Sequence, residues 1–473
     1  MVVERSAARP RPQKAKAAVP SPVSAGDAGS ERLRALESER QSLAVILDLL
    51  RTGRASTRLD LEREARLGRA VVTDRIATLT AFGFIDESGL GRSIGGRAPR
   101  LLRFRPDAGR LLVANLDRDT IGVGLADIQG RLILEHFEDV EVGASPDTLF
   151  DRLDALFGWC LGQDDSPPLW GMGLGLPEPV ETGEKVVQAT GWSASGVTER
   201  LMQRFKAPVW VRSAVQLETM GESGALDLAQ GRNMLFVSLG REISAGFLSA
   251  GRLHHGASGV AGQIGHTYAG DGHTVVCGCG NIGCLETVAG CDAIAREATS
   301  AAEEGRSRVL AELRERNGLV TIADIGTAAR LGDPFAADLL ARSGRLIGTV
   351  LATVINLLNP STVVVGGELA QTGDICIAGI REGVYRHAQP LVTRDLGIGR
   401  SRMGRSSGLV GAATVSVQEI FAPTFLEAWI TLGTPLAHPA VVALLDGTRR
   451  PRPAQDAVPP PPVGVASRGA ARR

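Results

Sequence analysis

Three cysteines fall within ten residues in the run CGCGNIGCLE, at positions 277–286, and a histidine precedes them in the segment GQIGHT. Thiolate and imidazole are the ligands that tetrahedral Zn²⁺ prefers, and three thiolates with one imidazole leave no coordination position open. That pattern is typical of a structural zinc rather than a catalytic one. The alternative, a disulfide between Cys277 and Cys279, would be strained and would need an oxidising compartment. The sequence therefore predicts a Zn²⁺ site formed by His266, Cys277, Cys279 and Cys284.

The 473 residues suffice for two or three domains, and their net charge of zero is unevenly distributed. Residues 41–106 carry 12 Arg against 7 acidic residues, whereas residues 107–448 have a net charge of −13. A basic front module joined to an acidic one favours a polyanionic partner, with ordinary solvated arginines as the alternative. The Pro-, Ala- and Arg-rich ends predict a disordered arm over 1–38 and a disordered tail in a C-terminal extension, 421–473, because such segments bury little apolar surface.

The sequence also bears on location. No stretch reaches the ~18 consecutive apolar residues of a membrane span, and the start of the chain lacks the apolar core of a secretory signal. The cysteines are clustered, unlike those of a disulfide framework. These features predict a cytoplasmic protein with no membrane partner.

Residues 39–106 are predicted to form a winged helix-turn-helix. Two apolar stripes at helical spacing indicate its first and third helices: Leu43, Ile46, Leu47 and Leu50, then Val72, Ile76 and Leu79. Between them, Thr57 and Asp60 have the spacing of a capping box, with Asp in place of Glu. The segments GFIDE and LLRFR flank a glycine-rich stretch and predict a two-stranded wing.

This geometry predicts which side chains would meet double-stranded DNA. The N-terminal part of the third helix would lie in the major groove, with the base edges facing Arg69, Ala70, Val71 and Thr73. Wing arginines would reach phosphates or a minor groove: Arg92, Arg97 and Arg100. The alternative is a winged helix used only for protein contacts. Three positions depart from the usual pattern, since Arg66 replaces a turn glycine, Gly68 replaces a capping Ser, and Asp74 would repel phosphate.

Residues 107–420 predict an α/β module. Buried strands such as LWGMGLGL, NMLFVSLG and STVVVGG alternate with helical stretches such as PDTLFDRLDALFGWCL. This alternation favours mixed sheets in two lobes around a cleft.

Three motifs in this module carry a family resemblance: GASGVAGQIGH, CGCGNIGCLE and NPSTVVVGGELA. Together with GLPEPV and the pair GW at 191–192, they resemble the ROK family of repressors and sugar kinases, from about residue 40 to 420. The resemblance implies an actin-like, ribonuclease H-like fold of two lobes behind the winged helix, and a homodimer or homotetramer. It also implies a structural zinc that shapes a sugar-contacting loop.

The resemblance further implies candidate ligand-binding residues, namely Ser213, Gln263, His266 and Glu286. Ser213 stands where the kinases have Asn, and Gln263 stands where they have Glu. A polar pocket with altered partners binds a hexose weakly, which leaves two alternatives open. The pocket senses a different carbohydrate, or it is a remnant and no sugar effector exists.

By the same resemblance, the catalytic elements of the kinases are missing. Ala214 stands where the kinases have the Asp that takes a proton from the sugar hydroxyl. Acidic side chains stand in the three phosphate-binding loops, where backbone should approach phosphate: Asp117, Glu242 and Glu368. No catalytic residue is therefore predicted, and the module is interpreted as a pseudokinase.

The sequence thus predicts a DNA-binding transcriptional regulator, a repressor of carbohydrate-related genes, with an inactive kinase-like domain for effector binding or dimerisation. The alternative is a sugar kinase with a regulatory DNA-binding domain, against which Ala214 argues.

Overall fold

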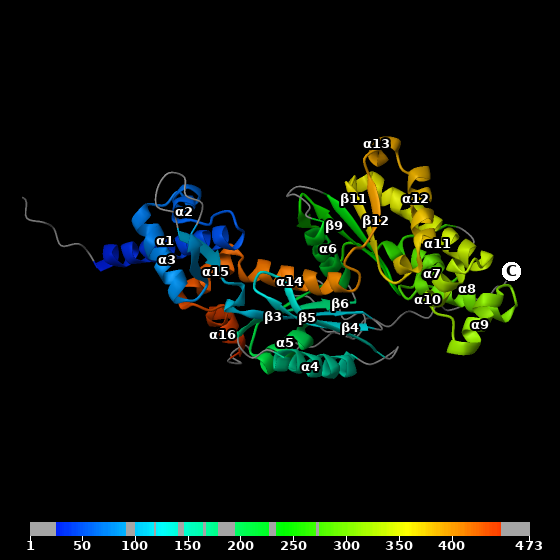
Figure 1. Cartoon of the computed structure of the whole chain (residues 1–473), viewed down its shortest axis with the longest axis horizontal. Helices are drawn as coiled ribbons and strands as arrows, with labels where there is room; N and C mark the ends of the chain where they lie inside the picture. Colours follow the sequence, from blue (N-terminus) through cyan, green and yellow to red (C-terminus); the bar gives the residue numbers. More distant parts are fainter. Residues whose placement is uncertain are drawn as a thin grey trace, which may run out of the picture.

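A computed structural model of the chain places a small helical domain beside two α/β lobes (Figure 1). It describes residues 25–90, 100–117, 120–140, 146–163, 167–177, 194–226, 233–270 and 274–445. The segments GLPEPV and GW of the sequence motifs lie largely outside these residues, as do the predicted disordered ends at 1–24 and 446–473.

The helical domain is the predicted winged helix-turn-helix. Its elements are α1 (Ala25–Arg51), α2 (Arg58–Ala65), α3 (Arg69–Ala81), β1 (Ile85–Leu90) and β2 (Arg100–Phe104). Both predicted apolar stripes are buried, and the capping box of Thr57 and Asp60 is present in full. The strands β1 and β2 pair antiparallel, with Ile85 opposite Phe104. The prediction of three helices and a wing is confirmed.

The predicted disordered arm is partly wrong, because α1 begins at Ala25 and so includes residues 25–38. This segment reads AGDAGSERLRALES, and Ala, Glu, Arg and Leu are among the strongest helix formers. Their propensity extends the first helix about five turns beyond the apolar stripe that predicted it.

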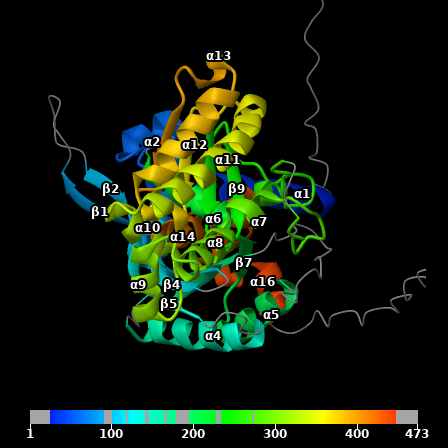
Figure 2. The same cartoon turned by 90° about the vertical axis from the view of Figure 1, so that its right-hand side faces the viewer.

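The first lobe is a five-stranded sheet in the order β5-β4-β3-β6-β7. Its strands are β3 (Arg110–Leu116), β4 (Thr120–Asp127), β5 (Leu132–Asp139), β6 (Leu169–Leu176) and β7 (Val209–Ser213). The first three are antiparallel, and β3, β6 and β7 are parallel. A short η1 (Pro106–Ala108) precedes the sheet, and α4 (Pro146–Gln163) and α5 (Ala194–Phe205) lie along its outer side (Figure 2).

The second lobe holds another five-stranded sheet, in the order β10-β9-β8-β11-β12. Its strands are β8 (Met234–Leu239), β9 (Ile243–Ser249), β10 (Arg252–Leu253), β11 (Thr362–Gly366) and β12 (Gly397–Arg400). Its helices are η2 (Ile264–His266), α7 (Leu285–Ala289), α8 (Cys291–Glu303), α9 (Arg308–Asn317), α10 (Ile322–Arg330), α11 (Pro334–Leu358), η3 (Leu369–Thr372), α12 (Asp374–His387) and α13 (Pro390–Thr393). The prediction of a two-lobed α/β module is confirmed.

Two helices pack against each other where the lobes meet, α6 (Ala214–Ala225) and α14 (Ser406–Ile420). Their backbones touch at two glycines. A Cβ on Gly221 would overlap the carbonyl oxygen of Ser407, and one on Gly411 would overlap that of Leu217. Since any side chain there would push the helices apart, the two glycines fix this contact.

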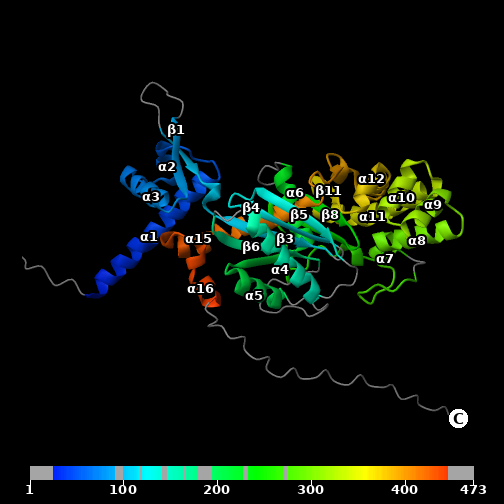
Figure 3. The same cartoon turned by 60° about the horizontal axis from the view of Figure 1, so that its bottom comes forward.

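The C-terminal extension follows α14, which ends at Ile420, the predicted end of the large module. It forms α15 (Pro423–Trp429), η4 (Ile430–Leu432), η5 (Pro435–Ala437) and α16 (Pro439–Leu445), and α15 contacts α1 (Figure 3). Its buried side chains share one apolar core with the winged helix and with the first lobe. This shared core could not be predicted, because the apolar residues at 421–445 do not indicate which distant surface they pack against.

Among the described residues, no single helix is long and apolar enough to span a membrane. One pair, α14 with the segment Pro423–Leu432, reaches the length and composition together but is bent by 63°. Its buried residues belong to the apolar core just described.

Candidate nucleic-acid interface and metal centre

The N-terminal face of α3 is open to solvent. Its predicted base-facing residues are all exposed, namely Arg69, Ala70, Val71 and Thr73. The turn before it is tight, and Arg66 has a φ of 54°. This left-handed conformation is unfavourable for a residue with a side chain and favours glycine. Gly68 is the N-cap and makes no side-chain cap bond. The backbone N–H groups at this helix start are therefore left for another acceptor.

Asp74, which the sequence marked as a residue that would repel phosphate, is paired. Its carboxylate accepts a hydrogen bond from Nη1 of Arg75 at 2.6 Å, and the same guanidinium donates to Glu39 and Ser42 of α1. The negative charge of Asp74 on α3 is thus partly offset by Arg75.

Of the three wing arginines predicted to contact DNA, the structure describes Arg100, and its side chain already forms hydrogen bonds within the protein. Its Nη1 donates to Glu87 at 2.7 Å, and Arg58 at the start of α2 donates to the other oxygen of the same carboxylate at 2.6 Å. These hydrogen bonds, led by that from Arg100, lower the pKa of Glu87. A phosphate contact by Arg100 must therefore compete with Glu87. Arg92 and Arg97 lie outside the described residues.

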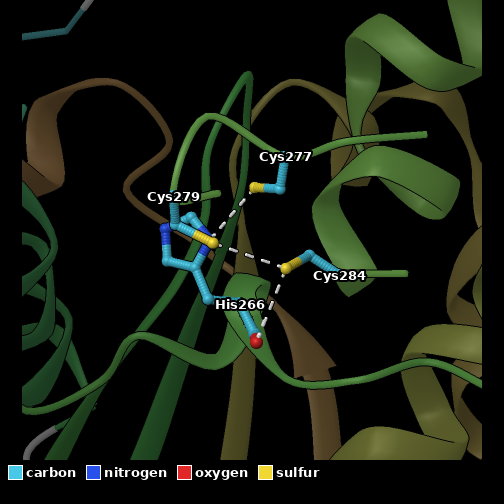
Figure 4. A group of neighbouring side chains, drawn as sticks. All are labelled: His266, Cys277, Cys279 and Cys284. Carbon is cyan, nitrogen blue, oxygen red and sulfur yellow. Dashed lines mark hydrogen bonds between the residues drawn. The ribbon is translucent and has the colours of Figure 1, made fainter. Parts of the chain in front are cut away.

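The four predicted metal ligands converge, with all ligand atoms within 4.8 Å of one another (Figure 4). Sγ of Cys279 lies 3.6 Å from Sγ of Cys284, and Sγ of Cys277 lies 3.4 Å from Nδ1 of His266. A zinc tetrahedron with Zn–S near 2.3 Å and Zn–N near 2.1 Å has edges of about 3.8 Å and about 3.6 Å. The cluster therefore has nearly the size that a tetrahedral ion requires. All six cysteines of the chain are free thiols, so the predicted alternative of a disulfide is not formed.

Backbone pairing holds the cysteine loop in this shape. Tyr268 pairs with Cys284 and Val276 with Ile282 in two isolated antiparallel bridges. The N–H of Cys277 also donates to the carbonyl of Asn281 at 2.8 Å. Cys284 is the N-cap of α7, so the loop directly sets where that helix begins.

The predicted sugar-contacting residues come from both lobes. His266 belongs to the metal cluster, and Gln263 is exposed just before η2. Glu286 lies in the first turn of α7, where its Oε2 accepts a hydrogen bond from the N–H of Ile243 at 3.1 Å. Ser213 is buried at the end of β7 in the first lobe. His266 and Glu286 lie on either side of the cysteine loop in the second lobe, and Ser213 belongs to the sheet of the first lobe.

A buried glutamine, which the sequence did not single out, links these parts. Nε2 of Gln216, on α6, donates to the carbonyl of Gly259 at 3.0 Å, and its Oε1 is buried with no hydrogen-bond partner among the described residues. Gly262, at a φ of 107°, runs so close to β9 that a Cβ would overlap the carbonyl oxygen of Ala245. A polar side chain among the apolar positions of α6 was the available signal.

The positions that the sequence analysis compared with the kinase elements lie near a cleft of about 700 Å³ between the lobes. Asp117 and Glu368 line it, whereas Glu242 lies in the β8–β9 turn, where its carbonyl accepts from the N–H of Gly240 at 3.3 Å. Ala214 is the first residue of α6 and offers no proton acceptor. Two further polar residues line the cleft, Asn115 and Glu218, and the sequence did not single out either.

Comparison with known proteins agrees with this arrangement. Residues 134–419 match the ROK family. The chain is 31% identical to a glucokinase of Halalkalibacterium halodurans over 53% of this chain and 77% of that protein. It is 24% identical to a xylose repressor of Caldicellulosiruptor bescii over 80% of this chain and 96% of that protein. A solved ROK family transcriptional regulator, a homologue of the Escherichia coli Mlc protein, superimposes with a TM-score of 0.69 at 24% identity, covering 84% of this chain and 99% of that one.

Fold and site together define a winged helix-turn-helix joined to a two-lobed, kinase-like module with a Cys₃His cluster. The chain belongs to the ROK family.

Proposed function

We propose that this chain is a DNA-binding transcriptional regulator, a repressor of carbohydrate-related genes, whose kinase-like module has no catalytic activity. The observation that carries the proposal is the exposed start of α3, presented by a winged helix that shares its core with the large module. The match to the xylose repressor, which includes nearly all of that protein, supports the same function.

For DNA binding, α3 would lie in the major groove with Arg69, Ala70, Val71 and Thr73 toward the bases. The hydroxyl of Thr73 donates to the carbonyl of Arg69 at 2.9 Å, which leaves its methyl group for apolar contact with a thymine. Arg92, Arg97 and Arg100 on the wing would add phosphate contacts, each of which steepens the salt dependence of binding.

For the absence of catalysis, the support is chemical. A phosphoryl transfer needs a base near the sugar hydroxyl, and the alanine at 214 cannot accept a proton. The carboxylates of Asp117 and Glu368 in the cleft would repel the phosphates of a nucleotide.

The metal that we propose for the Cys₃His cluster is Zn²⁺. It would be held by His266, Cys277, Cys279 and Cys284, and with four protein ligands it would supply structure, not Lewis-acid chemistry. Because Cys284 caps α7, the ion would fix Glu286, two residues later, against the backbone of β9. A cytoplasmic location, and a homodimer or homotetramer as the DNA-binding form, complete the proposal.

For effector binding, the proposal has two alternatives. In the first, a sugar or sugar derivative binds near Gln263, His266 and Glu286, with Ser213 contributing from the facing lobe. In the second, no sugar binds and the large module serves as an assembly scaffold. An effector that controls DNA binding must bind the DNA-competent and DNA-incompetent states with different affinities.

The alternative function is a sugar kinase with a regulatory DNA-binding domain. The match to a glucokinase, at higher identity but over about half of the chain, favours it. The two functions differ in their chemistry, because a kinase must consume ATP in the presence of a hexose and a pure regulator does not.

The experiment that tests the proposal is fluorescence anisotropy of the full-length protein with the DNA upstream of its own gene. Binding should be tighter to this DNA than to a shuffled sequence at two salt concentrations, and a panel of sugars should then show whether one of them releases it. Binding of equal strength to both DNAs would contradict the proposal.

A further inference from the structure

The start of α2 and the base of the wing form one charged surface. Arg58, the first residue of α2, donates from Nη2 to Oε1 of Glu87 at 2.6 Å, and Arg100 of β2 donates from Nη1 to Oε2 at 2.7 Å. The backbone joins the same two segments, because the N–H of Leu102 donates to the carbonyl of Ser56 at 2.8 Å. One carboxylate of β1 therefore holds two guanidinium groups from segments that are far apart in the sequence.

This charged surface flanks the proposed recognition helix. The helix α3 packs against both α2 and β1. When the second helix of a helix-turn-helix lies in the major groove, the first helix crosses the phosphate backbone beside it. On the proposed function, the side chains at the start of α2 and on the wing would therefore lie close to phosphates.

The two arginines remain accessible in spite of their shared partner. The side chain of Arg58 is 48% exposed and that of Arg100 is 68% exposed, whereas that of Glu87 is 24% exposed. In the part of the chain that the structure describes, neither guanidinium forms another ion pair. The hydrogen bonds from Arg100 and Arg58 lower the pKa of Glu87, so its carboxylate is charged at neutral pH. Two positive charges against one negative charge leave an excess that attracts phosphate, and a phosphate must compete with Glu87 for the same N–H groups.

We propose that Glu87 competes internally with DNA phosphate for Arg58 and Arg100, and so sets the sequence-independent part of the affinity for DNA. This inference rests on the proposed function and extends it, because it adds Arg58 to the DNA contacts and gives a role to a carboxylate. Phosphate contacts carry no sequence information directly, whereas base contacts do. A weaker phosphate contribution leaves a larger share of the binding free energy to the base contacts of α3.

Fluorescence anisotropy of the full-length protein with shuffled DNA, over a series of salt concentrations, tests this role. We expect Glu87→Gln to bind shuffled DNA about threefold or more tightly than the wild type. The plot of log affinity against log salt concentration should also become steeper, by about 0.9 for each arginine that gains a phosphate. The upstream DNA should show the same gain, because the added contacts are not sequence-specific.

Two controls separate the release of the arginines from a general loss of negative charge. Asp48→Asn removes a carboxylate that pairs with Arg51, whose guanidinium lies over the ring of Phe421 on the side of the domain that faces the lobes. This variant should leave the affinity and its salt dependence nearly unchanged. In a protein that carries Arg58→Gln and Arg100→Gln, adding Glu87→Gln should tighten binding no more than Asp48→Asn does. Far-UV circular dichroism checks that each variant is folded, and Glu87→Ala takes the place of Glu87→Gln if the latter does not fold.

Three results would overturn the proposal. Glu87→Gln binds DNA as the wild type does, it binds more weakly, or its gain persists when both arginines are already replaced. Failure of the regulator proposal gives a different pattern, in which the wild type binds upstream and shuffled DNA equally well or binds neither. Equal binding still allows the comparison on shuffled DNA, so the role of Glu87 is tested in that case as well. A wild type that binds no DNA at the lowest salt concentration overturns both proposals.

Discussion

The indole ring of Trp429 packs edge-on against the ring of Phe84, with centroids 5.8 Å apart and planes at 88°. Trp429 ends α15 of the C-terminal extension, and Phe84 directly precedes the first wing strand. Both side chains are fully buried, and Trp170 of the first lobe meets both rings at 5.6 Å. The winged helix is thus held by a packed aromatic core, which restricts its orientation relative to the lobes.

Replacing Trp429 by alanine should remove the centre of this core. We expect Trp429→Ala to lower the free energy of unfolding by about 3–5 kcal/mol, the usual cost of truncating a buried large aromatic side chain. Urea denaturation followed by circular dichroism measures the change. Leu432→Ala, an exposed position in η4, should change it by less than about 0.5 kcal/mol. Equal midpoints for the two variants would contradict the packing described.

The predicted zinc site is tested by measuring how much zinc the purified protein contains. The wild-type protein should retain one zinc ion per chain after gel filtration, and Cys279→Ala should lose it because three ligands no longer close the tetrahedron. Inductively coupled plasma mass spectrometry gives the ratio. Cys160→Ala removes a buried thiol of the first lobe outside the cluster and should keep the zinc. A wild type without zinc, or a Cys279 variant with the full amount, would refute the assignment.

The proposal that the module has no kinase activity predicts the outcome of placing a carboxylate at position 214. Neither the wild type nor Ala214→Asp should transfer phosphate from ATP to glucose above the rate without protein. The substitution returns a carboxylate to the start of α6, but the acidic residues of the cleft still oppose ATP. A coupled assay of ADP release measures this. Turnover by the wild type would favour the alternative function, a sugar kinase.

The raised pKa of Glu218 predicts that the free energy of unfolding depends on pH. Its pKa is raised from 4.5 to about 8, mainly by burial and by Asp117, with a smaller contribution from Glu222. The folded chain therefore holds a proton that the unfolded chain has lost between these pH values, and stability falls as pH rises through that window. Glu218→Gln should remove this decline. Between acid pH and pH 7, the free energy of unfolding of the wild type should therefore fall by on the order of 3 kcal/mol more than that of the variant. If the difference in free energy of unfolding between the two proteins is the same at every pH, Glu218 does not titrate in this way.

Much of the winged helix could be predicted because its signals are local. The stripe of Val72, Ile76 and Leu79 and the capping box of Thr57 lie within single helices, so spacing alone identifies them. The Cys₃His cluster was predictable for a related reason, since ligand type restricts which residues can meet. The start of α1 at Ala25 was missed because helix propensity outweighed the lack of an apolar stripe.

Contacts between distant segments could not be predicted. Nothing near Trp429 in the sequence indicates that it packs on Phe84, and nothing in VRSAVQLETMGE indicates that Glu218 faces a cleft rather than solvent. The position of Glu218 depends on how α6 packs against α14, where Gly221 and Gly411 allow close contact of the two backbones. The ion pair of Asp74 with Arg75 was likewise not predicted, and it partly neutralises a charge that the sequence alone indicated would repel phosphate.

The central claim, that α3 reads DNA, is tested most directly by the affinity of Arg69→Ala for the upstream DNA over a range of salt concentrations. We expect this variant to bind about 1–3 kcal/mol more weakly than the wild type and to lose much of its preference over shuffled DNA, because a base contact carries specificity. Arg316→Ala, which removes an exposed arginine from α9 of the second lobe, should match the wild type at each salt concentration. If the Arg69 and Arg316 variants bind the upstream DNA equally well and as well as the wild type, α3 is not the recognition helix.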